Sequence, residues 1–206
     1  GGASTDIVTS LMVNANDELT LLGITGSTNF PVTPGAFSTS FQGGSSIGFI
    51  SSGVVFPNGT DIFLAKFNAA GSALAGSTYF GGSGNDGLNY LAATNPITYL
   101  LIPATGVATT QTCGNHSLLS NYGDQFRGEI GLDTNGNVYI CSSTRSGDLP
   151  LAGAFDNSLG GKQDVVVAGF SSSLNSLLFS SYLGGSGMEC GNGIFMTACL
   201  TTATPS

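Results

Sequence analysis

Short runs of apolar residues recur along this chain, separated by stretches rich in glycine, serine and asparagine. Apolar residues are nowhere spaced every three or four positions over a long enough window to form a helix. Asn-Gly and Gly-Gly pairs between the runs supply the positive φ angles that tight hairpins need. The pattern therefore predicts an all-β chain of short antiparallel strands.

An internal repeat organises these strands. The segment STYFGGSG at Ser77–Gly84 recurs as SSYLGGSG at Ser180–Gly187, 103 residues later. The preceding run DIFLAKF at Asp61–Phe67 recurs at the same offset as DVVVAGF at Asp164–Phe170. Repeats of this kind indicate stacked structural units. The positions that mark the repeat are Asp61, Asp164, Tyr79, Tyr182, Gly81, Gly82, Gly184 and Gly185.

A second pair of segments sets the unit boundaries. Glu18–Phe37 matches Asn137–Phe155, and the changing offset between copies reports two insertions. The units expected from this alignment are residues 1–80 with an insertion at 45–60, residues 81–183 with an insertion at about 88–127, and a truncated third unit at 184–206. Each full unit holds about four strands, which suits one blade of a propeller.

Together these segments resemble the bacterial β-propeller repeat labelled SBBP. The matching elements are the Asp-led strands, the paired-glycine segments, the turn Asp133–Asn137 and the segment Phe30–Gly44. The resemblance implies antiparallel four-stranded blades, here about two and a half repeats of an incomplete β-propeller. Propellers close with about 4–8 blades. The expected partners are therefore further blades of the same polypeptide or another protein chain.

The same resemblance extends to large secreted surface proteins of Bacteroidota, often exported by type nine secretion. It implies an extracellular or cell-surface location. The chain carries a formal charge of −8, and its four basic residues are scattered. Neutralising phosphates requires clustered bases, so nucleic acid is excluded as an expected partner. The sequence has no apolar run of about 20 residues, so no membrane insertion is expected.

Two short motifs match catalytic or cofactor patterns and are interpreted as loops. Gly82–Gly87 reads GxGxxG, but no helical pattern follows to face a dinucleotide. Gly44–Gly48 reads GxSxG, but the chain has a single histidine, His116, to serve a nucleophile. The prediction is a protein that is not an enzyme. A carbohydrate-active enzyme using two carboxylates stays as an alternative.

Calcium is the one cofactor retained as an alternative. Asp133, Asn135 and Asn137 place oxygen donors at alternate positions, like the opening of a calcium loop. An ordinary hairpin turn at Asp133–Asn137 is the favoured interpretation, with no cofactor. A disulfide between Cys190 and Cys199 is also kept open, with free buried cysteines favoured.

The leading functional hypothesis is a non-catalytic binding or adhesion scaffold. Long loops on a rigid repeat often carry binding, so Ser45–Thr60 and Leu88–Arg127 are expected to form a contact surface, with surface glycans among the ligands. The alternative is a structural segment of an extracellular fibre or a secretion-linked assembly.

Overall fold

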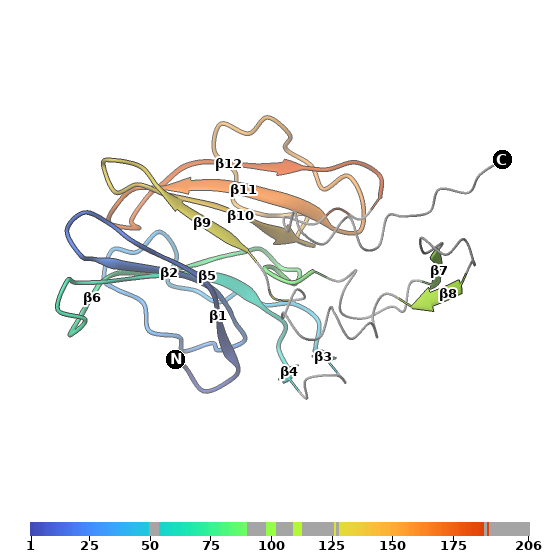
Figure 1. Cartoon of the computed structure of the whole chain (residues 1–206), viewed down its shortest axis with the longest axis horizontal. Helices are drawn as coiled ribbons and strands as arrows, with labels where there is room; N and C mark the ends of the chain where they lie inside the picture. The colour runs from blue at the N-terminus through green and yellow to red at the C-terminus, as the bar shows by residue number, and fades with distance from the viewer. Residues whose placement is uncertain are drawn as a thin grey trace.

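The computed structural model describes residues 1–49, 54–89, 98–101, 109–112, 126, 128–187 and 189. The prediction of an all-β chain is confirmed. Two four-stranded antiparallel sheets are the largest elements in this part of the chain (Figure 1). Both sheets are open, and no closed sheet occurs among the described residues.

Each sheet is a simple up-and-down arrangement of four strands. The first sheet contains β1 (Asp6–Val13), β2 (Leu19–Thr25), β5 (Asp61–Phe67) and β6 (Leu74–Phe80), in that order. The second sheet contains β9 (Glu129–Leu132), β10 (Val138–Thr144), β11 (Asp164–Phe170) and β12 (Leu177–Leu183), in that order. Two separate hairpins pair β3 (Ile47–Phe49) with β4 (Val54–Phe56), and β7 (Thr98–Leu101) with β8 (Thr109–Thr112).

The two sheets share one strand register. The β5–β6 pairing begins at Ile62↔Phe80 and shifts between Lys66 and Phe67. The β11–β12 pairing begins at Val165↔Leu183 and shifts between Gly169 and Phe170, at the repeat-equivalent positions. An irregularity that recurs at equivalent positions is typical of a feature specified by the sequence.

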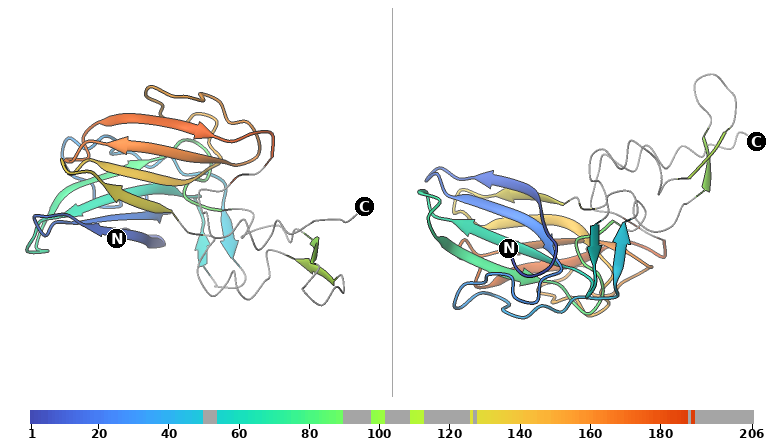
Figure 2. Two further views of the ribbon diagram at one scale, coloured as in Figure 1. Left: turned by 45° about the horizontal axis from the view of Figure 1, so that its top comes forward. Right: turned by 90° about the horizontal axis from the view of Figure 1, so that it is seen from below.

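The two sheets lie on each other as two layers (Figure 2), and the residues of their shared core show that opposite faces are in contact. We call the face of the first sheet that meets the second sheet its front face, and the equivalent face of the second sheet is also a front face. The face of the second sheet that is covered in this contact is its back face, and the equivalent face of the first sheet is also a back face. The front face carries Leu22, Ile62, Leu64 and Phe80. The back face carries Val138, Ile140, Val166, Ala168 and Phe170. Burying one large apolar side chain contributes about 1.5–3 kcal/mol, so this shared core is the main contact between the sheets.

A loop of the first repeat also enters this contact. The Phe37 ring lies 6.4 Å from Phe80 and 5.8 Å from Phe170, measured between ring centroids. The Phe37 amide donates to the Leu174 carbonyl at 2.9 Å. Leu174 is fully buried at φ 59°, where the equivalent Gly71 has φ 65°. Leu174 therefore holds a left-handed backbone conformation that favours glycine, and its side chain packs in the same core as Phe37.

The long insertion interrupts the first strand of the second sheet. In β1 the register shifts between Val8 and Ser10. In the second repeat Asp86 bridges to Thr144, and pairing resumes only at Glu129 in β9. The insertion thus enters next to the position where the intact strand has its bulge. A bulged residue is already unpaired, so a loop there costs little pairing.

In the part of the chain that the structure describes, no helix is both long and apolar enough to cross a membrane.

Candidate functional site

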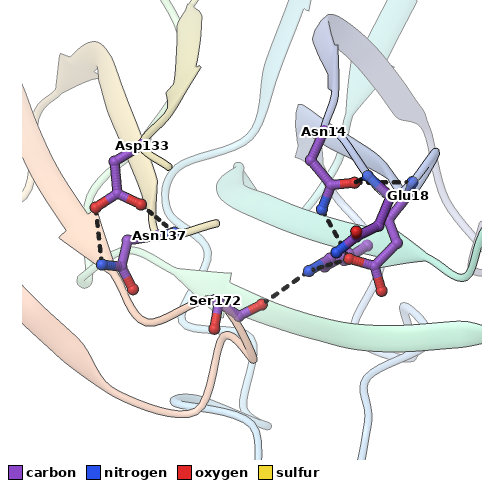
Figure 3. Close-up of polar contacts among 7 residues, drawn as sticks. Asn14, Glu18, Asp133, Asn137 and Ser172 are labelled. Carbon is purple, nitrogen blue, oxygen red and sulfur yellow. Dashed lines mark hydrogen bonds and ion pairs between the residues drawn. The ribbon is translucent and has the colours of Figure 1, made fainter. Parts of the chain in front are cut away.

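Two equivalent hairpin turns lie side by side at one end of the stacked sheets (Figure 3). In the β1–β2 turn, Asn14 Oδ1 accepts from the amides of Asn16 at 2.9 Å and Glu18 at 3.0 Å. In the β9–β10 turn, Asp133 Oδ1 accepts from the amides of Asn135 at 2.9 Å and Asn137 at 2.8 Å. Each side chain caps its own turn, as Asn and Asp commonly do.

A groove of about 500 Å³ separates these turns. Lys66, on the front face of β5, lies in the groove, and its amine is 2.8 Å from Glu18 Oε2. The amine also donates to the Ser172 carbonyl of the second sheet at 3.4 Å. The hydrogen bond from Lys66 lowers the pKa of Glu18, and Asn14 adds to the effect. Lys66 thus joins a turn of the first sheet to a turn of the second.

Asp133 satisfies both of its oxygens within its own repeat. Its second oxygen accepts from Asn137 Nδ2 at 2.9 Å and from the Tyr139 hydroxyl at 3.1 Å. Partial desolvation raises the pKa of Asp133, but hydrogen bonds from Asn137, Tyr139 and Asn135 outweigh it and lower the pKa overall. Donating its hydroxyl proton to the Asp133 carboxylate raises the pKa of Tyr139.

This geometry bears on the three residues predicted to offer calcium ligands. The structure brings Asp133, Asn135 and Asn137 into one turn, but a cation would compete with four donors for the Asp133 oxygens. The described residues contain no group of three or more His, Cys, Asp or Glu side chains that could hold a metal ion. Calcium at this turn stays the alternative to the favoured hairpin turn without a cofactor.

The two tyrosines that mark the repeat make the same contacts in both sheets. The Tyr79 hydroxyl accepts from the Phe30 amide at 2.8 Å and donates to the Ser27 carbonyl at 2.8 Å. The Tyr182 hydroxyl accepts from the Leu149 amide at 3.1 Å and donates to the Ser146 carbonyl at 2.7 Å. Each hydroxyl therefore fastens the loop after the second strand to the fourth strand.

The first pair of marker glycines leads from β6 into the second sheet and lies against two buried carboxylates. A Cβ on Gly81 would lie 2.7 Å from Asp86 Oδ2 and 2.8 Å from Asp61 Oδ1, so no side chain fits there. Asp61 accepts from the amides of Gln42 at 2.7 Å and Gly43 at 2.9 Å. Burial raises the pKa of Asp61 to about 6 and that of Asp86 to about 8.

The second pair of marker glycines has a similar but less enclosed setting. Asp164 accepts from the Gly160 amide at 2.8 Å, and a Cβ on Gly184 would lie 2.5 Å from Asp164 Cγ. Gly185 is exposed. Asp164 Oδ1 and Glu189 Oε2 are buried and have no hydrogen-bond partner in the part of the chain that the structure describes.

Sequence reasoning missed the acidic residue that follows each glycine pair. Asp86 Oδ2 accepts from the Gly82 amide at 2.8 Å, as Asp6 Oδ2 does from Gly2 at 2.5 Å. Glu189 follows Gly185 at the same spacing. The signal was available, since an acid four residues after the second glycine occurs in all three copies.

The remaining motif residues fall into two groups. Gly44–Gly48 leads into strand β3 and not into a helix, so it lacks the strand-to-helix turn of a nucleophile elbow. Gly82–Gly87 forms the connection between the sheets. Cys141 is half-buried in β10. The other predicted positions, His116, Cys113, Cys190 and Cys199, lie outside the described residues.

Comparison with known proteins adds no relative: no protein-family model matches the chain, and no curated protein does.

Proposed function

We propose that this chain is a segment of a secreted or cell-surface β-propeller, acting as a non-catalytic scaffold for binding or adhesion. The observation that carries this proposal is the recurrence of one strand register and one set of loop contacts in two stacked sheets. Front-to-back stacking of equivalent four-stranded sheets is the arrangement by which propeller blades bury each other's faces. The two sheets are then two blades.

The scaffold role is supported by where sequence variation enters the repeat. The loop equivalent to Ser45–Thr60 is shortened to two residues in the second repeat, while the insertion after Asp86 enters beside a bulge position. The residues of the core shared by the two sheets lie outside both insertions. A rigid core with variable loops is typical of proteins that bind through their loops.

Binding of the full chain to an array of bacterial and host polysaccharides tests this function. We expect retention of at least one neutral glycan, and loss of it when residues 90–125 are replaced by a short Gly-Ser loop that leaves the buried Leu88 and Phe126 in place. The Leu178→Lys variant is the control, since Leu178 is 47% exposed on β12, outside both insertions. Hydrolysis of a bound glycan, abolished by one Asp substitution, would overturn the non-catalytic assignment.

A further inference from the structure

The contact between the two sheets shows what covers each face of this repeat. The front face of the first sheet lies on the back face of the second. The back face of the first sheet and the front face of the second have no sheet against them in the part of the chain that the structure describes. The chain therefore leaves one front face and one back face uncovered, and it already packs a front face on a back face between its own two sheets.

The back face of the first sheet is hollowed and apolar. A cavity of about 450 Å³ opens on it, beside the half-exposed Val8. Its apolar lining includes Leu21, Phe63, Phe67 and Leu74. The repeat-equivalent positions on the second sheet are Ile140, Val166, Phe170 and Leu177, all of which belong to the core shared with the first sheet. The cavity thus lies where the front face of another repeat would pack.

The front face of the second sheet offers the matching half. Phe155 is 90% exposed, whereas the equivalent Phe37 lies between the sheets against Phe170. Leu183 is 52% exposed, whereas the equivalent Phe80 is fully buried. Exposed apolar residues that cluster on one face commonly mark an interaction site.

We propose that a second copy of this chain docks here, head to tail. The front face of the second sheet of one copy packs on the back face of the first sheet of the next. Phe155 of one copy then meets Phe67 of the other, as Phe37 meets Phe170 within the chain. The inference rests on the proposed function, because it takes the sheets to be stacking repeats. A head-to-tail contact of this kind builds either a ring or an open filament.

Two connecting segments would overlap when the copies dock, and this overlap weakens the association. Gly184–Glu189 of one copy and Gly1–Asp6 of the next occupy equivalent places in the repeat, so one of them must move. Gly184–Gly187 is exposed. The segment is held by a bond from the Lys162 amide to the Gly187 carbonyl and by two bonds between Gln163 and Glu189. We expect Gly184–Glu189 to be displaced, so a chain ending at Leu183 associates more tightly than the full chain.

Sedimentation equilibrium of the full chain over a range of concentrations measures the association. Salt of about 0.15 M or more is needed, because copies with a charge of −8 repel each other. We expect Phe155→Lys and Val8→Lys each to weaken dimerisation at least about tenfold, a typical loss at a central interface residue. Val55→Lys, with a similarly exposed side chain, leaves it unchanged.

Mixing the two variants gives the decisive result. Phe155→Lys keeps an intact back face and Val8→Lys keeps an intact front face, so together they form a 1:1 dimer, although each alone associates at least about tenfold more weakly than the unsubstituted chain. A symmetric contact through a single patch would not be restored by mixing. A full chain that stays monomeric, a mixture that fails to dimerise, or a shorter chain that associates less overturns the docking. Glycan binding by a strictly monomeric chain would overturn the docking alone and leave the proposed scaffold standing.

Discussion

The Asp86 carboxylate accepts a hydrogen bond of 2.5 Å from the Thr144 hydroxyl, and this contact ties the connection between the sheets to the end of β10. The first sheet repeats it, with Asp6 accepting from Thr25 at 2.5 Å. Ser146 also donates to Asp86, at 2.7 Å. In each repeat an aspartate carboxyl group therefore holds the end of the second strand, fully buried for Asp86 and half-buried for Asp6.

This arrangement predicts a dependence of stability on pH. Burial raises the pKa of Asp86 to about 8, and that of Asp61 to about 6. A raised pKa means that the folded chain holds the proton more tightly than the unfolded chain, whose carboxyl groups titrate near pH 4. The stabilisation of the folded chain by these protonated carboxyl groups is complete below about pH 4 and is lost as the pH rises to about 8. For Asp86 it is on the order of a few kcal/mol.

Urea unfolding at closely spaced pH values measures this effect. Asp86→Asn cannot ionise, so the fall in unfolding free energy between about pH 6 and 8 should flatten. Asp61→Asn is the matched control, because it should flatten the fall mainly below about pH 6. An Asp86→Asn variant with the slope of the unsubstituted chain between pH 6 and 8 would contradict the assignment.

The two marker tyrosines predict a pair of equal losses. Replacing Tyr79 with Phe leaves the Phe30 amide with only a 3.4 Å bond to the Ser27 carbonyl, and Tyr182→Phe removes the acceptor of the Leu149 amide. A buried donor left unpaired costs about 1–3 kcal/mol. We expect both variants to lose unfolding free energy in this range, within about 0.5 kcal/mol of each other. A large loss for one tyrosine alone would show that the two repeats do not use the hydroxyl in the same way.

The turn at Asp133 distinguishes a cap from a metal ligand. Asp133→Asn should lower the melting temperature less than Asp133→Ala, because its amide oxygen can still cap the turn as Asn14 does, while Asn137 Nδ2 and the Tyr139 hydroxyl lose their acceptor. Asp133→Ala should lower the melting temperature, since the Asn135 and Asn137 amides lose their acceptor. Melting with added calcium and then with EDTA completes the test. Stabilisation by calcium that Asp133→Asn removes would establish the metal site.

Much of the fold could be predicted because the repeat consists of strand-forming segments that recur at a constant spacing. Asp61–Phe67 and Asp164–Phe170 form strands over their whole length, and Tyr79 and Tyr182 take equivalent places. Which face of each strand is covered could not be predicted. A period of two separates the faces of a strand but does not say which one another sheet will bury.

The groove beside the turns was not predictable for a related reason. Lys66 has Gly169 as its repeat equivalent, so no repeated pattern signalled its ion pair with Glu18. The contact with Ser172 joins residues 106 positions apart and depends on how the sheets stack. The acidic residues after the glycine pairs were different, because their spacing was visible in the sequence and only their burial was not.

Hydrogen exchange of the Phe80→Ala variant tests the stacking of the two sheets most directly. Phe80 is fully buried between the sheets, and its removal should cost about 3–5 kcal/mol. Leu183→Ala is the matched control, because Leu183 holds the equivalent position but is 52% exposed, so it should cost less than about 1 kcal/mol. If the sheets share one core, Phe80→Ala accelerates amide exchange in β11 of the second sheet as well as in β6. Acceleration confined to the first sheet would contradict the shared core.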